Sequence, residues 1–253
     1  MGQALWPAKP QVAACPRLPG PSTNRARSHT PFHSAPAAAP LLRSPLPRRF
    51  RYANPVASHE TEAILEMFRQ TGAYLQGHFR LTSGLHSPEY LQCARVLMYP
   101  EYAGQLGRQI ADALQALTHL QTFDMVVSPA VGGLIIGHEA ARNLEARFLF
   151  TERNAEGRME LRRGFAVEPG ETAVVVEDVV TTGGSTAEVV ALLRQAGVSV
   201  KAAASIIDRS GGSADVGIPR IALATLKVVA YDPAACPLCA QGLPVVKPGS
   251  RPT

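Results

Sequence analysis

The order of apolar and polar residues divides the chain into short elements. From residue 123 onward, apolar runs of strand length alternate with amphipathic stretches. The runs predict strands over residues 123–129, 147–151, 172–177 and 198–207, and the stretches predict helices over residues 134–144 and 185–196. Strands that alternate with helices of this length are typical of βαβ units and a parallel sheet. We therefore predict an α/β fold in which helices flank a central, mainly parallel sheet, with ligands bound beyond the carboxyl ends of the strands.

Upstream of this region, the pattern predicts two helices and a hairpin. Ser58 is a typical N-cap residue, and the apolar stripe after it predicts a helix that Gly72 ends. Residues 77–93 mix aromatic, β-branched and turn residues, which favours a pair of short strands. A second helix is expected over residues 101–117, after Pro100.

The first 56 residues have no apolar period and are rich in Pro, Ala, Arg and Ser. Because they cannot bury enough surface to offset the entropy of ordering, we expect residues 1–56 to be disordered and the folded domain to span residues 57–253. An acid-free leader with Arg and Ser is typical of an organellar transit peptide, but a dispensable tail or an upstream start codon would have the same composition. We expect a cytoplasmic protein, with an organelle as the alternative if the leader is a transit peptide.

The net charge of +5 is unevenly distributed. No Asp or Glu precedes Glu60, and the basic leader leaves 17 basic and 20 acidic residues in the remainder. A nucleic-acid interface needs basic residues clustered on the folded domain, so this composition argues against nucleic acid as a partner. No apolar run approaches the roughly 20 residues that span a bilayer, so no membrane partner is expected. Four cysteines in a chain of 253 residues do not form a disulfide scaffold.

The chemistry is concentrated in VVVEDVVTTGGS, residues 174–185. A buried strand delivers Glu177 and Asp178 to its carboxyl end, and a Thr/Gly/Ser loop then leads into a helix. Glycines let the backbone N–H groups of this loop turn inward, hydroxyls add donors, and the helix N-terminus adds partial positive charge. The loop is therefore a phosphate cradle, and the adjacent acids need a hydroxylated partner. A ribose 5-phosphate supplies both groups.

This motif lacks the Lys of the nucleoside-triphosphate loop and the glycine spacing of the dinucleotide-binding loop. It is similar to the signature of the type I phosphoribosyltransferases, in which two acids, two small or apolar residues and Thr-x-Gly-x-[ST] follow a hydrophobic strand. The resemblance implies that fold, with a small hood from about residues 74–93 and a C-terminal tail over about residues 232–253. It also implies that 5-phosphoribosyl 1-diphosphate is bound by Glu177, Asp178, Val179, Val180, Thr181, Thr182, Gly183, Gly184 and Ser185.

Two further segments resemble the orotate phosphoribosyltransferases, and the resemblance covers about residues 60–251. GHFRLTSGLHSPEYLQC, residues 77–93, is similar to the hood of that family, where Tyr90 would lie against the pyrimidine. SIIDR ends a strand with Arg209, and a guanidinium can grip a carboxylated base bidentately. The resemblance implies that Thr181, Arg209 and Tyr90 bind orotate.

Two more segments resemble the diphosphate-binding parts of that family. In VVSPAVGG, residues 126–133, Gly132 and Gly133 let backbone amides approach anionic oxygens. Residues 151–164, TERNAEGRMELRRG, are polar and stand where the family has a mobile loop, so Arg153 and Arg158 are expected to meet the diphosphate. This region departs from the best-known family pattern, because no Lys or His occurs from residue 139 through residue 200. The positions of two further family lysines are occupied here by Gly132 and Thr82.

The resemblance implies transfer of a 5-phosphoribosyl group from 5-phosphoribosyl 1-diphosphate to orotate, which gives orotidine 5′-phosphate and diphosphate in pyrimidine synthesis. Glu177, Asp178 and Arg153 would be the catalytic residues, and no residue is assigned as the general acid. Mg²⁺ would be carried by the diphosphate, with no metal ligand supplied directly by the protein. Family members usually work as dimers, which implies a homodimer. The alternatives are a phosphoribosyltransferase for another base and a non-catalytic regulator that binds 5-phosphoribosyl 1-diphosphate.

The C-terminal tail contains CPLC, from Cys236 to Cys239. A C-x-x-C step can mark half of a zinc site or a redox pair, but no second Cys pair or His cluster is expected to accompany it. A structural turn or incidental thiols is therefore the favoured interpretation. The sequence assigns no role to four histidines that lack metal-ligand spacing, His78, His86, His119 and His138.

Overall fold

The computed structural model describes residues 58–81 and 83–248, and these residues belong to one compact unit. The leader over residues 1–56 and the position of Thr82 lie outside the described residues, so the interpretations made for them stay predictions. None of the described helices is long and apolar enough to cross a membrane.

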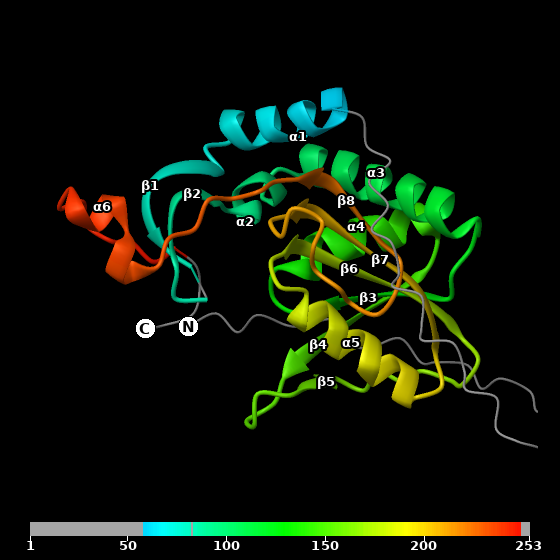
Figure 1. The fold of residues 1–253 in the computed structure, drawn as a ribbon. Coiled ribbons are helices and arrows are strands. Elements are labelled where there is room, and N and C mark those ends of the chain that lie inside the picture. The colour runs from blue at the N-terminus through cyan, green and yellow to red at the C-terminus, as the bar shows by residue number, and fades with distance from the viewer. Residues whose placement is uncertain (1–57, 82, 249–253) are drawn as a thin grey trace, which may run out of the picture. The chain divides into compact units, whose positions relative to one another are not determined.

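A six-stranded sheet forms the centre of this unit (Figure 1). Its strand order is β5-β4-β3-β6-β7-β8, and every neighbouring pair is parallel except β4 and β5, which are antiparallel. The strands are β3 (Met125–Pro129), β4 (Arg147–Arg153), β5 (Met159–Leu161), β6 (Thr172–Val180), β7 (Ser199–Asp208) and β8 (Arg220–Thr225). The mainly parallel sheet that the alternating pattern predicts is confirmed.

Helices lie on both faces of the sheet (Figure 1). One face packs against α1 (Ser58–Gln70), α2 (Cys93–Leu97), α3 (Pro100–Thr118) and α4 (Gly133–Leu144), and the other packs against α5 (Gly184–Gln195). Side chains of β6 alternate between the two apolar cores: Val174 and Val176 pack with the first group of helices, and Val175 packs with α5. This alternation follows from the pleat of a strand, and it decides where the acidic residues of β6 point.

A second, two-stranded sheet pairs β1 (Tyr74–Arg80) with β2 (His86–Leu91) in antiparallel fashion. The C-terminal segment, which contains the short helices η1 (Pro233–Ala235) and α6 (Pro237–Ala240), runs beside this hairpin (Figure 1). Tyr231 exchanges two backbone hydrogen bonds with His86, and Val246 bonds with the backbone of His78 and Arg80. We use the name hood for β1, β2 and residues 231–246. Residues far apart in the sequence are therefore neighbours in the hood.

The structure differs from the sequence-based expectations at several elements, among them the short helices α2, η1 and α6, which were not expected. β6 continues to Val180, three residues beyond the expected end at Glu177. β8 was not expected, because its Ala-rich run is too short to show a period, yet five of its six residues are buried. Residues 151–164, expected to form a polar, mobile loop, are in part a hairpin of β4 and β5. Its turn forms because the side chain of Asn154 accepts backbone N–H bonds from Glu156 and Arg158.

Candidate functional site

The phosphate-cradle motif lies at the junction of β6 and α5, as the sequence indicates. Gly183 has a φ of +82°, a conformation that glycine adopts without strain, and a Cβ atom there would lie 2.8 Å from Cγ1 of Val216. α5 begins at Gly184, so its first N–H groups face the loop. Thr181 and Thr182 are exposed, Ser185 is half-buried, and Val180 is buried at the end of the strand. The loop therefore presents hydroxyl and N–H donors to solvent at the helix N-terminus.

The two acidic residues of β6 are half-buried and lie on opposite faces of the sheet. Glu177 points toward α5, where the hydroxyl of Thr186 donates a hydrogen bond to its Oε2. Asp178 points toward α4, and a Cβ atom on Gly132 would lie 2.5 Å from its Oδ1. Because β6 ends two residues later, both carboxylates flank the start of the phosphate loop. The pair is separated by the strand and does not form a shared carboxylate site.

Burial perturbs both carboxylates. The pKa of Glu177 is raised to about 7, chiefly by burial; the Thr186 hydrogen bond and the charge of Arg153 act to lower it, and the charge of Asp178 acts to raise it. Burial also raises the pKa of Asp178, although a backbone hydrogen bond from Val179 opposes this effect. Perturbed carboxylates beside a loop of N–H and hydroxyl donors are typical of a functional site.

The segment between β3 and α4 approaches Asp178 through its glycines. The Ala130–Val131 peptide bond is cis, and α4 starts at Gly133. A Cβ atom on Gly133 would lie 2.9 Å from the Cβ of Ser128, so this position also has no room for a side chain. Gly132 thus lets the backbone of this loop lie directly against the carboxylate of Asp178, and Gly133 lets it lie against β3 and β6.

Arg209 follows β7 and faces the hood. Its guanidinium carbon lies 5.9 Å from the centre of the Tyr90 ring, and its Nε is buried and has no hydrogen-bond partner among the described residues. Burial lowers the pKa of this guanidinium. The Sγ of Cys93, just after β2, donates to the backbone oxygen of Asp178 at 3.8 Å. These contacts bring the predicted base-binding residues to the acid-bearing end of β6.

Asp208, which the sequence analysis gave no functional role, fixes the backbone beyond Arg209. It is fully buried, and its Oδ1 accepts from the backbone N–H and the hydroxyl of Ser210 at 2.7 and 2.6 Å. Its Oδ2 accepts from the backbone N–H of Gly212 and from the buried guanidinium of Arg220, at 2.9 and 3.1 Å. Only the tertiary structure brings Arg220 to this carboxylate.

The arginines of the β4–β5 hairpin are divided between ion pairs and solvent. Arg153 forms a 2.8 Å ion pair with Glu188 of α5, and its charge lowers the pKa of Glu177. Arg158 is exposed and has no ion-pair partner among the described residues. Arg163 pairs with Glu152 at 2.7 Å. Arg153 is therefore near the acids of β6, and Arg158 is not brought to them.

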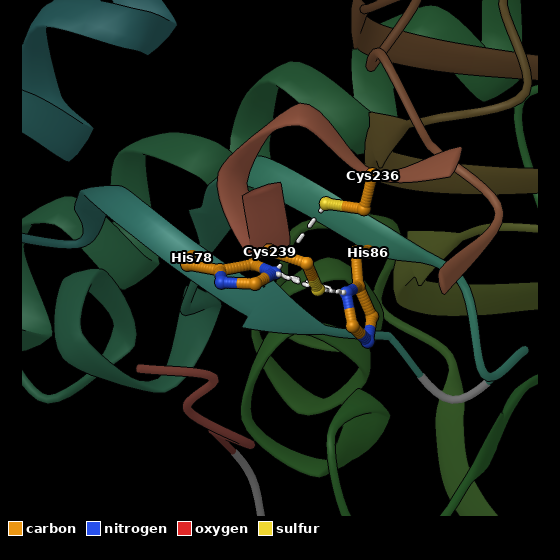
Figure 2. A group of neighbouring side chains, drawn as sticks. All are labelled: His78, His86, Cys236 and Cys239. Atoms are coloured by element: carbon orange, nitrogen blue, oxygen red, sulfur yellow. Dashed lines mark hydrogen bonds between the residues drawn. The ribbon is translucent and has the colours of Figure 1, made fainter. Parts of the chain in front are cut away.

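A second cluster of side chains lies in the hood, outside this site. Figure 2 shows His78, His86, Cys236 and Cys239 pointing toward one another. The expectation that no His cluster accompanies the CPLC step is wrong, because the folded chain places two histidines beside it. His119 and His138 are not part of the cluster.

Comparisons with known proteins agree on one family. The family model "Phosphoribosyl transferase domain" matches residues 102–223. An orotate phosphoribosyltransferase of Desulforamulus reducens is 50% identical over 190 residues, which cover 75% of this chain and 97% of the relative. One from Thermotoga petrophila is 52% identical over 188 residues, which cover 74% of this chain and 98% of the relative. The crystal structure of orotate phosphoribosyltransferase from Aeropyrum pernix matches with a TM-score of 0.54 and 26% identity, covering 65% of this chain and 94% of that chain.

Proposed function

Because the chain belongs to the orotate phosphoribosyltransferase family, we propose that it transfers the 5-phosphoribosyl group of 5-phosphoribosyl 1-diphosphate to orotate. The products are orotidine 5′-phosphate and diphosphate, in the synthesis of pyrimidine nucleotides. The family and fold class inferred from the VVVEDVVTTGGS motif are confirmed by these relatives and by the fold of the Aeropyrum pernix enzyme.

The observation that carries the choice of base is the position of Arg209. Its guanidinium lies over the Tyr90 ring and holds a buried N–H donor with no partner among the described residues. A buried donor without a partner is costly, and the carboxylate of orotate is a group that satisfies it with a charge-assisted bond. Uracil, adenine and hypoxanthine lack a carboxylate. Arg209 and Tyr90 would thus select orotate, with Thr181 contacting it from the phosphate loop.

The reaction breaks the bond between the ribose C1 and the diphosphate oxygen, and a ring nitrogen of orotate donates its electron pair to C1. The phosphate loop would hold the 5-phosphate through the N–H groups of Gly183, Gly184 and Ser185. Asp178 and Glu177 would accept hydrogen bonds from the ribose hydroxyls and stabilise the positive charge that develops on the sugar. Holding the ribose still between the loop and the carboxylates lowers the entropic part of the barrier.

The donor set fits a Mg²⁺ ion that arrives with the substrate. Among the described residues, one cluster of three or more metal-ligating side chains is found, and neither Glu177 nor Asp178 belongs to it. Mg²⁺ keeps several waters and takes few protein ligands, so the diphosphate and ribose oxygens would supply most of its coordination. When bound, the ion supplies charge neutralisation of the departing diphosphate. The chain's own residues at this position orient the sugar.

Charge compensation by the protein would come from backbone N–H groups and arginine. The backbone at Gly132 lies against Asp178, and the charge of Arg153 lowers the pKa of Glu177. Arg158 would reach the diphosphate only if the β4–β5 hairpin moves toward the site, which is the closing motion that excludes water in such enzymes.

The proposal is tested by steady-state assays with orotate, uracil, adenine and hypoxanthine. We expect orotate to be used with the highest kcat/KM, and Arg209→Ala to raise the KM for orotate at least tenfold with a smaller effect on kcat. Arg108→Ala, an exposed position on α3, is the matched control and should leave both constants unchanged. Equal use of two bases would favour a different phosphoribosyltransferase, and tight ligand binding without diphosphate release would favour a regulator.

We further propose a homodimer in the cytoplasm. The resemblance to dimeric family members supports the dimer, and exposed apolar side chains such as Met98 and Tyr99 offer a surface for it. Light scattering after size-exclusion chromatography tests the homodimer, and a monomer at micromolar concentration would contradict it.

Mass spectrometry of the N-terminus of the protein isolated from cells would show whether the leader is removed, which is the outcome expected of a transit peptide.

A further inference from the structure

The cluster in the hood is built from three segments of the chain, namely β1, β2 and the CPLC segment at α6. His78 lies on β1 and His86 on β2, Cys236 immediately precedes α6, and Cys239 lies within α6 (Figure 2). The side chains of His78, His86 and Cys236 are buried, and Cys239 is exposed. One ligand atom from each residue, two imidazole nitrogens and two sulfurs, lies within 4.8 Å of all the others.

Three of the six distances between ligand atoms are close to those of a tetrahedral metal site, and all six are within 4.8 Å. With Zn–N of about 2.0 Å and Zn–S of about 2.3 Å, tetrahedral ligand atoms are about 3.3 Å apart for two nitrogens and about 3.5 Å apart for nitrogen and sulfur. Here the Nε2 of His78 lies 3.5 Å from the sulfur of Cys236 and 3.7 Å from that of Cys239. The Nδ1 of His86 lies 3.3 Å from the sulfur of Cys239 and 2.9 Å from the Nε2 of His78. Three of these distances lie within about 0.2 Å of the tetrahedral values, and the fourth is about 0.4 Å short.

A hydrogen bond outside the cluster orients one of the ligands. The Nδ1 of His78 lies 2.8 Å from the backbone oxygen of Leu243, which can only accept a hydrogen bond. His78 therefore carries its proton on Nδ1 and turns the lone pair of Nε2 toward His86 and the two sulfurs. Metal-binding histidines use this arrangement, in which the second ring nitrogen donates to a carbonyl and fixes the ligand nitrogen.

We propose that His78, His86, Cys236 and Cys239 bind one Zn²⁺ ion in a structural site. Two thiolates neutralise the charge of the ion, and the mixture of thiolate and imidazole ligands favours zinc over magnesium or calcium. Four protein ligands complete a tetrahedral shell and leave no position for a substrate, so the ion would hold structure and take no part in phosphoribosyl transfer.

The ion would join the two ends of the domain. The backbone hydrogen bonds of Tyr231 with His86, and of Val246 with His78 and Arg80, already lay the C-terminal segment along the hairpin. A two-stranded hairpin is only marginally stable by itself, and a structural metal supplies stability that a small unit cannot draw from its core. Because β2 also carries Tyr90, the ion would fix the strand that presents this ring to Arg209.

Metal content is the direct test. The full chain is expressed in zinc-supplemented medium and purified without a histidine tag or chelator. Inductively coupled plasma mass spectrometry should then find about one zinc per chain. Replacement with Co²⁺ should give the visible bands of a tetrahedral ion and thiolate-to-cobalt charge transfer. A reduced wild-type chain that contains no zinc and does not bind added Zn²⁺ or Co²⁺ would overturn the proposal, as would a native Cys236–Cys239 disulfide.

Variants locate the site within the chain. Cys239→Ser and His86→Asn should each lose most of the zinc, whereas Cys239→His keeps a ligand of the right type and should retain it. Cys93→Ser and His138→Asn are the matched controls, because both residues lie outside the cluster, and they should keep the full content. Zinc retained in both Cys239→Ser and His86→Asn, or lost equally in the controls, would place the ion elsewhere.

Hydrogen exchange of the wild-type protein tests whether the ion holds the C-terminal segment against the hairpin. Removal of zinc by a chelator should speed exchange of the backbone amides of β1 and β2, and unchanged exchange would refute this role.

Discussion

Glu177 gives a quantitative prediction that links burial to stability. Its pKa is about 7 in the folded protein, against 4.5 for a solvated glutamate, so the folded state holds a proton that the unfolded state has released between these values. The slope of the unfolding free energy with pH is proportional to the number of protons bound in the unfolded state minus the number bound in the folded state. Because the folded state binds more protons here, the free energy of unfolding falls as the pH rises from about 4.5 to about 7. A pKa difference of about 2.5 corresponds to about 3 kcal/mol. Partial solvent exposure of the carboxylate reduces this to about 1–2 kcal/mol.

The perturbation is Glu177→Gln, which keeps an acceptor for the Thr186 hydroxyl and cannot ionise. We expect the variant to unfold with a free energy close to that of the wild type at pH 5, and about 1–2 kcal/mol higher at pH 8. A domain of this size would then melt roughly 2–8 °C higher at pH 8. The same variant should lose activity, because an amide cannot stabilise positive charge on the ribose.

Urea titrations at pH 5 and pH 8 measure the free energy of unfolding of the variant and of the wild type. Subtracting one free energy from the other at each pH removes the contribution of every group that titrates equally in the two proteins. Glu168→Gln, at an exposed position on the segment before β6, is the matched control and should show the same pH dependence as the wild type. The reasoning is refuted if the difference between Glu177→Gln and the wild type is the same at both pH values, or if the variant is less stable at pH 8.

Three further predictions concern the same end of the sheet. Asp178→Asn should lower kcat more than tenfold with little change in melting temperature, and near-full activity in steady-state assays would contradict its role at the ribose. Gly132→Ala would place a Cβ 2.5 Å from the Asp178 carboxylate, so kcat should fall at least tenfold, and unchanged kinetics would show that this close approach is not needed. Asp208→Asn removes the negative charge that pairs with the buried Arg220, and it should cost about 3 kcal/mol in urea unfolding. It should also raise the KM for orotate through the loop of Arg209, and an unchanged KM would argue that Asp208 only stabilises the fold.

The sequence by itself determined the class of fold and the centre of the site. Strands and helices alternate with clear periods, and the motif from Val174 to Ser185 is one strand, one loop and one helix, so its geometry depends on neighbouring residues alone. Arg209 was predicted from the sequence as a base-binding residue, because SIIDR ends a strand and the carboxyl ends of adjacent parallel strands meet at one edge of a sheet. The absence of Lys and His from residues 139–200 was also visible in the sequence, because it concerns one continuous stretch of the chain.

The tertiary structure decided the features that depend on distant residues. Asp208 shows its role only when Arg220 of β8 is placed beside it, and the proximity of Gly132 to Asp178 requires the pairing of β3 with β6. The histidines of the hood are separated from CPLC by about 150 residues, and neither pair alone has the spacing of a complete metal site. They meet because the C-terminal segment pairs with the β1–β2 hairpin, a contact set by long-range backbone hydrogen bonds that leave no periodic trace in the sequence.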